Sequence, residues 1–416
     1  MNAPSHIPPE LINDFDIYDD RLVSNFRHCL DDLPPVSYTT ANGGHWIIQG
    51  YQEITAAMRD PETFSSWPAS LPADLAKGRG RFIPLEYDPP EHSAYRSVLS
   101  SYFSVGRVRE LDGTFRSLAR SLIDQFAGRG ECDFMESFAR PFPAMMFLGL
   151  MGWPLEKMTD FCTWVDGFQH GGGGLSGDER VKNVRASSIA SAYDYFRGFV
   201  RARRAEPGDD ITSALVQAVL PDGRHLTEDE ILDYIFLLLI AGLHTVEGAL
   251  AFGVMHFATH PDDRQRVIDE PKVLVTTVEE LLRLEPPAWG TGRVAAREVT
   301  IGGVTIRPGE KVLLPHQTAN LDPAAFPDPD RFDPERMPNA HVSFGGGPHR
   351  CMGAHLARIE LRVAFEELHA RIRDYTLDPA RPPVQHMSQT RGVASLPIRF
   401  GPSLPPAAEE AGRAAG

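Results

Sequence analysis

A chain of 416 residues, 42% apolar and 23% charged, is long enough to bury one large core or two ordinary ones, which excludes a minimal or unfolded protein. A formal net charge of −15 argues against nucleic acid as a partner, because phosphate binding needs a basic surface. The 4 cysteines are scattered without a CxxC spacing, so neither a disulfide framework nor a zinc cluster is indicated.

The first residues, MNAPSHIPPELINDFD, lack the basic and apolar regions of a signal peptide, so we expect a soluble, cytoplasmic protein. The longest apolar run, YIFLLLIAGL at 234–243, is about half of the ~20 residues needed to cross a bilayer. We interpret it as part of a core helix and expect no membrane partner.

Most segments carry helical periodicity, and strand patterns are short. Helices are predicted over 112–127, 133–151, 185–204, 227–259 and 351–373. Strands are predicted at 45–50, 299–314 (as a hairpin around Gly302 and Gly303) and 394–400. The expected fold is mainly α with a minor β region (α+β), in one domain over 1–401, followed by a disordered tail over 402–416.

The clearest predicted helix begins after Thr227, which forms a capping box with Glu230, and ends at Pro261. At ~1.5 Å per residue it would span roughly 50 Å, so it must pass through the core. The segment 167–179, with four consecutive glycines at 171–174, is expected to be a flexible connector. Either a mobile lid or a plain surface loop fits it.

Cys351 lies in FGGGPHRCMG, residues 344–353, followed on the next helix by Leu356, Ala357, Arg358 and Glu360. A lone cysteine is more often an apolar filler, but the glycines suit a tight turn, and a helix start favours a thiolate. The pattern resembles the haem-thiolate loop of the cytochrome P-450 family, closest to soluble, camphor-hydroxylase-like bacterial members. The resemblance implies the P-450 fold, a long central helix over haem b, Cys351 as the iron ligand, and a cofactor-binding loop that includes Phe344, Gly345 and Gly353.

Two further motifs are similar to parts of this family. Glu280 and Arg283 in EELLR resemble its Glu-x-x-Arg pair, which would hold the backbone of a meander over 319–336. Leu321 replaces a frequent arginine, so a third member of this polar network is expected to be missing. His92, Arg96, Arg293 and His349 match the positions that bind haem propionates, since buried carboxylates need cationic or N–H partners.

AGLHT, residues 241–245, resembles the family's oxygen groove. Ala241 and Gly242 leave space, and the Thr245 hydroxyl can turn back onto a carbonyl and kink the helix. His244 stands where the family commonly has an acid. It could relay protons, or it could be bonded elsewhere while Thr245 and water deliver protons; iron ligation by His244 is a further, less favoured alternative.

The resemblance implies a monooxygenase that uses O2 as co-substrate. Electrons would come from NAD(P)H through a separate reductase and ferredoxin, because the chain shows no nucleotide-binding glycine motif. An acidic ferredoxin would dock near the cysteine loop, where positive charge is supplied by Arg96, Arg107, Arg109, Arg350 and Arg358.

The resemblance to the family also implies which residues line the substrate pocket. Its expected lining is Phe82, Ile83, Leu237, Ile240, Ala241, Trp289, Thr291, Gln389 and Thr390. The tyrosine that binds camphor would fall at Gly80, so camphor itself is not expected. Trp289 would shrink the pocket or offer a stacking face, and the polar groups would either bind an oxygen atom or satisfy nearby backbone. A small terpenoid-like or aromatic, oxygen-bearing molecule is therefore expected.

Two alternative functions also fit the sequence. The chain could hold haem through Cys351 without turnover, as a sensor, although the groove residues argue against that. It could also use peroxide directly, for which His244 would serve as an acid-base group.

Overall fold

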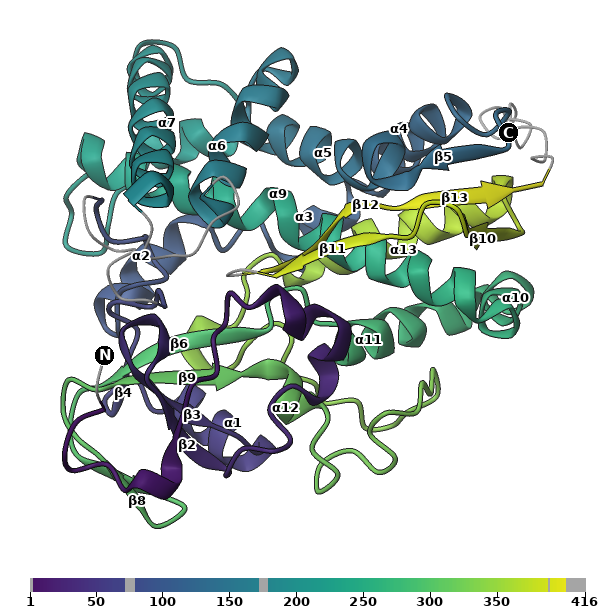
Figure 1. Cartoon of the computed structure of the whole chain (residues 1–416). Coiled ribbons are helices and arrows are strands. Elements are labelled where there is room, and N and C mark those ends of the chain that lie inside the picture. The colour runs from purple at the N-terminus through teal and green to yellow at the C-terminus, as the bar shows by residue number, and fades with distance from the viewer. Residues whose placement is uncertain (1–2, 72–78, 172–178, 388–389, 402–416) are drawn as a thin grey trace.

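The computed structural model describes residues 3–71, 79–171, 179–387 and 390–401. Figure 1 shows a helical body crossed by one long helix, α9 (Glu228–Thr259), with a sheet region beside it that contains the N-terminal segment. The first and last described segments lie apart in the view, since the chain leaves the sheet region, builds the helical body and ends in a second group of strands.

The helical body and its flanking helices follow the chain in order. The bounds are α1 (Tyr51–Arg59), α2 (Glu91–Leu99), α3 (Val105–Arg109), α4 (Asp112–Asp124), α5 (Pro141–Met151), α6 (Met158–His170), α7 (Glu179–Ala205), α8 (Ile211–Gln217), α9, α10 (Pro261–Asp269), α11 (Leu274–Leu284), α12 (His316–Asn320) and α13 (Ala354–Arg371).

The main sheet has six strands in the order β1-β2-β3-β9-β6-β4. Its strands are β1 (Ile12–Asn13), β2 (Val36–Thr39), β3 (His45–Ile48), β4 (Phe64–Ser65), β6 (Gly290–Ala295) and β9 (Lys311–Pro315). A three-stranded sheet joins β10 (Tyr375–Leu377), β13 (Pro397–Phe400) and β5 (Glu131–Asp133). Two hairpins pair β7 (Val299–Ile301) with β8 (Val304–Ile306) and β11 (Val384–Met387) with β12 (Arg391–Ser395).

Most predicted elements are confirmed, including the hairpin at Gly302 and Gly303, whose φ angles are 56° and 81°. The single helix expected over 133–151 is wrong. Asp133 ends β5 and its carboxylate accepts the Met135 N–H at 2.9 Å, after which a π-helical turn (Met135–Ala139) precedes α5. Pro141 begins α5 as a first-turn residue.

The predicted connector is also shorter than expected, because α6 continues to His170 and ends at Gly171 in the left-handed conformation. Residues 172–178 and the predicted tail at 402–416 lie outside the described residues.

The central helix α9 begins as the sequence predicts. Thr227 Oγ1 accepts the Glu230 N–H at 3.2 Å, and a Glu230 carboxylate oxygen accepts the Thr227 N–H at 2.8 Å. The same Glu230 side chain accepts the Tyr95 hydroxyl of α2 at 2.7 Å, and Arg224 pairs with it at 2.8 Å. The N-terminus of α9 is therefore fixed to α2.

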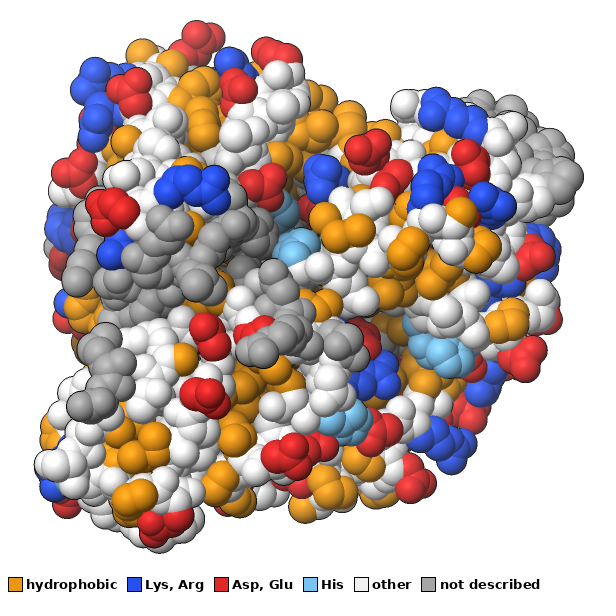
Figure 2. Space-filling model, viewed as in Figure 1, with side chains coloured by type: hydrophobic (Ala, Val, Ile, Leu, Met, Phe, Trp, Pro, Cys, Tyr) orange, Lys and Arg blue, Asp and Glu red, His pale blue; other side chains and the backbone are white. Residues whose placement is uncertain are grey.

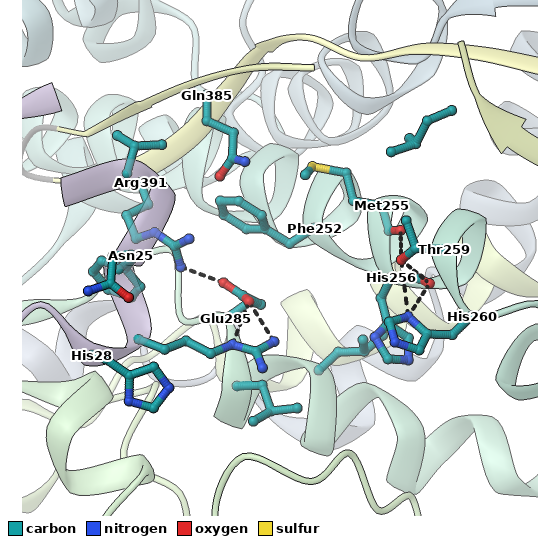
Figure 3. A pocket seen from close by; sticks show the side chains of 16 residues that line it. Asn25, His28, Phe252, Met255, His256, Thr259, His260, Glu285, Gln385 and Arg391 are labelled. Atoms are coloured by element: carbon teal, nitrogen blue, oxygen red, sulfur yellow. Dashed lines mark hydrogen bonds and ion pairs between the residues drawn. The ribbon is translucent and has the colours of Figure 1, made fainter. Parts of the chain in front are cut away.

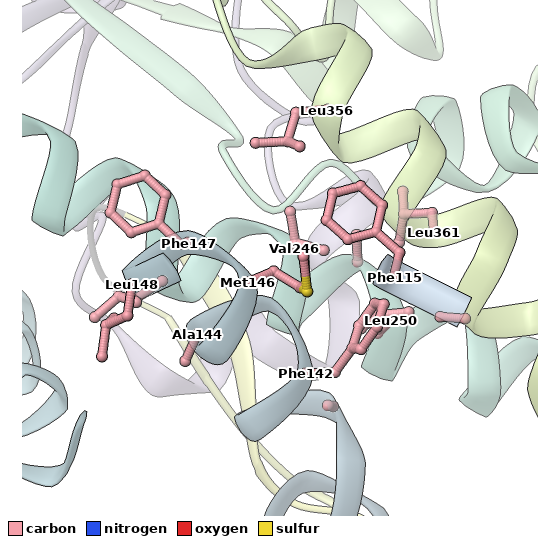
Figure 4. Packing of buried hydrophobic residues seen from close by; sticks show 14 of the residues in the cluster. Phe115, Phe142, Ala144, Met146, Phe147, Leu148, Val246, Leu250, Leu356 and Leu361 are labelled. Carbon is pink, nitrogen blue, oxygen red and sulfur yellow. The ribbon is translucent and has the colours of Figure 1, made fainter. Parts of the chain in front are cut away.

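By length and composition α9 could cross a membrane, but 67% of its most apolar 18-residue window is buried inside the fold. Figure 4 shows the reason: α9 contributes Val246 and Leu250 to a cluster with Phe115, Phe147 and Leu361 from the surrounding helices. Burying each such side chain contributes roughly 1.5–3 kcal/mol, which favours a core helix.

Charged side chains of both signs are interspersed over the face shown in Figure 2. On that face the basic groups do not gather into a single patch of the kind that binds nucleic acid.

Candidate active site

The cysteine loop joins the meander region to α13. The Cys351 N–H donates to the Phe344 carbonyl at 2.8 Å, and the Gly345 N–H donates to the Val342 carbonyl at 2.7 Å, which closes the loop into a tight turn. At Gly347, with φ of 60°, a Cβ atom would lie 2.1 Å from the Met58 carbonyl oxygen. Only glycine allows α1 to approach the loop so closely.

Cys351 faces a cavity of about 250 Å³ that Arg96 and Arg350 also border. The protein atoms around its sulfur raise the pKa of the thiol by burial, whereas the Gly353 N–H and the charges of Arg96 and Arg358 lower it. Burial is the larger effect, so the helix start does not by itself produce a thiolate. A bound cation is what would favour the deprotonated form.

Two buried imidazoles meet beside this loop. The rings of His92 on α2 and His349 in the loop lie 4.3 Å apart. His349 Nε2 lies 3.0 Å from the Ser66 hydroxyl, but the buried Nδ1 atoms of His92 and His349 have no hydrogen-bond partner among the described residues. Burial and the neighbouring His349 lower the pKa of His92 to about 4.

A buried guanidinium completes the set. Arg293 on β6 is 3% exposed, and burial lowers its pKa to about 10. Arg96 on α2 donates to the Arg350 carbonyl at 2.7 Å, which draws it to the cysteine loop. Unpartnered imidazole nitrogens beside a buried cation form a donor set for carboxylates, and therefore these residues fit the propionates of a haem group.

The Glu280–Arg283 pair on α11 is fully buried and holds the meander. Arg283 donates to Glu280 at 2.7 and 2.8 Å, and to the carbonyls of Asn320, Pro329 and Arg331. Glu280 in turn accepts the Asp333 N–H at 3.0 Å.

The expectation that this network lacks a third member is wrong. Arg336 donates to Glu280 at 3.1 Å, and the Asn339 amide donates to the other carboxylate oxygen at 3.0 Å. Arg336 lies within the predicted meander, in FDPER. The sequence alone does not show that this part of the meander folds back onto α11, where Arg336 meets Glu280.

The groove residues lie near the middle of α9. The Thr245 hydroxyl donates to the Ala241 carbonyl at 2.9 Å, as expected. A Cβ atom at Gly242 would lie 2.6 Å from the Phe147 ring, so glycine permits the close approach of α5. α9 remains α-helical through this stretch, so the bond from the hydroxyl to a helix carbonyl does not break the helix.

His244 is directed towards α6. Its Nε2 lies 3.2 Å from an Asp166 carboxylate oxygen and 3.9 Å from Glu247. The Asp166 side chain is 55% exposed, whereas those of His244 and Glu247 are 11% and 8% exposed. Arg140 lies 3.4 Å from Glu247, whose pKa is raised by burial. A polar chain thus leads from solvent to the groove helix, and sequence reasoning missed its outer member, Asp166.

Four of the predicted apolar pocket residues, Phe82, Ile83, Leu237 and Ile240, belong to the main hydrophobic cluster or pack against it. Phe82 contacts the rings of Phe168 and Phe236, both with centroids at 5.9 Å, and Ile83 is fully buried. Leu237 and Ile240 are partly buried on α9. The Arg79 guanidinium lies 3.4 Å from the Phe82 ring. Arg79 also forms a buried ion pair with Glu86 at 2.6 Å, which holds the guanidinium against the Phe82 ring. The sequence did not predict this ion pair.

The predicted polar pocket residues have internal partners. Thr390 Oγ1 donates to the Gln169 side chain at 3.0 Å, and Thr291 Oγ1 lies 3.4 Å from His316. Trp289 is only 2% exposed and meets Phe26 edge-on at 6.2 Å, so at least one contact of its ring is with the N-terminal segment. Gln389 lies outside the described residues.

Two of the five predicted docking arginines form ion pairs. Arg107 pairs with Glu110 at 2.9 Å, and Arg358 pairs with Glu279 at 2.6 Å while covering the Phe344 ring at 4.4 Å. Arg109 and Arg350 are exposed, and Arg96 is partly buried.

Comparison with known proteins places this geometry in a family. The family model described as Cytochrome P450 matches residues 180–400. The chain is 33% identical to "Probable cytochrome P450 127A1" of Sinorhizobium fredii over 94% of this chain and 95% of that protein. It is 37% identical to "Mycinamicin IV hydroxylase/epoxidase" of Micromonospora griseorubida over 82% of this chain and 86% of that protein.

The fold agrees with solved structures. The structure of CYP101J2 matches with a TM-score of 0.85 and 28% identity, over 96% of this chain and all of that one. That of CYP101C1 matches with a TM-score of 0.84 and 30% identity, again over 96% of this chain and all of that one. The chain belongs to the cytochrome P450 family, whose chemistry uses haem and O2, and is a P450 monooxygenase with bacterial relatives.

Proposed function

We propose that this enzyme binds haem b through Cys351 and inserts one oxygen atom of O2 into a small, oxygen-bearing terpenoid-like or aromatic substrate. The observation that carries the haem assignment is the set of buried donors without partners beside the cysteine loop, on His92 and His349. When bound, haem supplies the reductive activation of O2.

The protein's own residues would position that group. His92, Arg96, Arg293 and His349 would bind the propionates, because His92 and His349 have buried nitrogens without partners, Arg293 is a buried cation and Arg96 reaches the loop at Arg350. Phe344, Gly345 and Gly353 would shape the loop around the sulfur, and Ala241 would leave space on α9, whereas the space left by Gly242 admits the Phe147 ring.

The substrate class is proposed from the apolar lining. Phe82, Ile83, Leu237 and Ile240 suit a compact hydrophobic molecule, and the hydroxyls of Thr291 and Thr390 would supply the polar part of the pocket. Some relatives are named for larger substrates, among them mycinamicin IV and a steroid. Macrolides and steroids are therefore the comparison compounds.

Electrons are proposed to come from NAD(P)H through a separate reductase and a ferredoxin, in the cytoplasm. The exposed side chains of Arg109 and Arg350, with Arg96 beside them, support docking of an acidic ferredoxin near the loop. We propose a single domain over residues 1–401.

The test has two stages. The carbon-monoxide difference spectrum of the reduced protein should show the Soret band of thiolate ligation. The protein with NADH, a reductase and a ferredoxin should then oxidise compact terpenoids or aromatics in preference to a macrolide and a steroid. Haem binding without spin shift or product would favour a sensor. Product from peroxide alone, without redox partners, would favour a peroxygenase.

We expect His244 to deliver protons from solvent to the groove, with Asp166 as the outer group. His244→Ala should lower the fraction of NADH consumed that appears as product, because a general acid contributes about 10²–10⁴-fold to a proton transfer. Asp166→Asn should lower it as well, since it removes the negative charge that lies 3.2 Å from the imidazole. Product and NADH are quantified in the same reaction.

Asp160→Asn is the matched control, because Asp160 lies on the same helix and pairs with Lys157 at 2.8 Å on the surface. Coupling in that variant should equal that of the unmodified enzyme. Unchanged coupling in His244→Ala would show that Thr245 and water suffice.

A further inference from the structure

We propose that His256, His260 and Asp263 form a binding site for a divalent transition-metal ion of the Zn²⁺ type, away from the haem site. The three residues come from the end of α9 and the first turn of α10. One potential ligand atom from each lies within 4.8 Å of those from the other two. Neutral imidazoles with a carboxylate are donors that Zn²⁺ binds well.

His256 lies on the last turn of α9, and His260, four residues on, is the residue that caps the helix. Their rings are stacked, with centroids 4.3 Å apart and planes at 12°. His256 Nε2 lies 2.9 Å from an Asp263 carboxylate oxygen. Ligand atoms around a tetrahedral Zn²⁺ are ~3.4 Å apart, given bonds of about 2.1 Å. The three potential ligand atoms, which lie within 4.8 Å of one another, must therefore approach by up to about 1.4 Å, with the stacked rings turning towards a shared ion.

The tautomer of His260 suits a ligand. Its Nδ1 lies 3.1 Å from the His256 carbonyl oxygen, a group that only accepts hydrogen bonds. With the proton on Nδ1, which the Thr259 hydroxyl 3.0 Å away can also accept, the lone pair is left on Nε2. Metal-binding histidines are commonly held in this way, with the second ring nitrogen donating to a carbonyl.

The surroundings fix the other two ligands before any ion binds. The Phe332 ring lies 4.1 Å from that of His256, in addition to the contact with His260. Arg264, the residue after Asp263, donates to the Phe257 and Tyr375 carbonyls at 2.9 and 2.7 Å, which locks α10 onto α9. Little conformational entropy would then be lost on binding.

The site opens onto a cavity of about 340 Å³. Figure 3 shows His256 and His260 on one side of it and the Glu285–Arg391 ion pair on the other. Arg27 opposes positive charge on His256, but Arg27 is itself neutralised by Glu285 at 2.7 Å. Because His256 and His260 border this cavity, a water molecule from it could fill the fourth coordination position of the ion.

The metal would join two helices at the C-terminal end of α9. His256 is 11 residues beyond Thr245, a distance of roughly 16 Å along the helix. The ion would accordingly stabilise the fold without touching the groove, and the proposal does not depend on the haem assignment.

The test is calorimetric titration of the chelator-treated, haem-loaded protein with ZnCl2. We expect one ion to bind with low-micromolar or tighter affinity, and at least ~10-fold weaker binding in His260→Ala and in Asp263→Asn. Asp262→Asn and His225→Ala are controls, because both residues are exposed and outside the cluster. They should bind Zn²⁺ as the unmodified protein does.

Two further measurements guard against a folding artefact. Zn²⁺ should raise the Tm of the unmodified protein but not that of His260→Ala, while their Tm values in chelator should agree. X-ray absorption at the zinc edge should show two imidazole ligands. Absence of binding, or undiminished binding in both cluster variants, would overturn the proposal.

Discussion

Arg283→Ala should prevent folded, haem-loaded enzyme from accumulating. The Arg283 and Glu280 side chains are both 0% exposed, and the guanidinium serves the Glu280 carboxylate and three meander carbonyls at once. Removing one member of a buried pair costs about 3–5 kcal/mol, a large part of the 5–15 kcal/mol that stabilises an ordinary domain. The haem-to-protein ratio and urea unfolding would measure the loss.

Arg266→Ala is the matched comparison. Arg266 pairs with Glu335 at 2.7 Å, but the two side chains are 34% and 70% exposed. An exposed pair contributes about 0–1 kcal/mol, so this variant should fold and load haem normally. Equal stability of the two variants would mean that the meander does not depend on α11.

Cys351→Ser should abolish the thiolate signature of the carbon-monoxide complex. Serine keeps the size of the side chain but removes the soft, electron-donating sulfur, which is the part that favours O–O cleavage. Oxygen-dependent turnover should fall by at least about 100-fold, a barrier increase of roughly 3 kcal/mol. The loop should persist, because its turn is made by backbone bonds and not by the sulfur.

Cys29→Ser is the control, since Cys29 is a partly buried thiol whose pKa is raised to about 12 by burial. Its spectrum and turnover should match those of the unmodified enzyme. Retention of the thiolate spectrum in Cys351→Ser would remove Cys351 from the proposed role.

The local parts of the site could be predicted from the sequence. The Thr227 capping box, the back-bond of Thr245 and the Glu280–Arg283 pair all join residues within four positions of one another. Their geometry follows from the helix alone. The cysteine loop is equally local, and its tight turn agrees with the prediction.

The remaining parts depend on contacts between distant segments. Asp166 meets His244 only because α6 packs on α9, and Arg336 reaches Glu280 only because the meander returns to α11. Trp289 was placed in the pocket by alignment, but the N-terminal segment brings Phe26 against its ring. The spacing of residues along the chain does not predict contacts between segments that are far apart in the sequence.

The connection between Tyr95 and Glu230 limits how this chain can change in length. This hydrogen bond fixes α9 to α2, the helix that bears His92 and Arg96. The position of the groove along α9 and the direction it faces therefore depend on the number of residues between Glu230 and Ala241. One residue inserted between Glu230 and Ala241 would turn the groove by about 100° and move it by ~1.5 Å. Insertions in this segment should therefore be far less tolerated than insertions in the loop before Thr227.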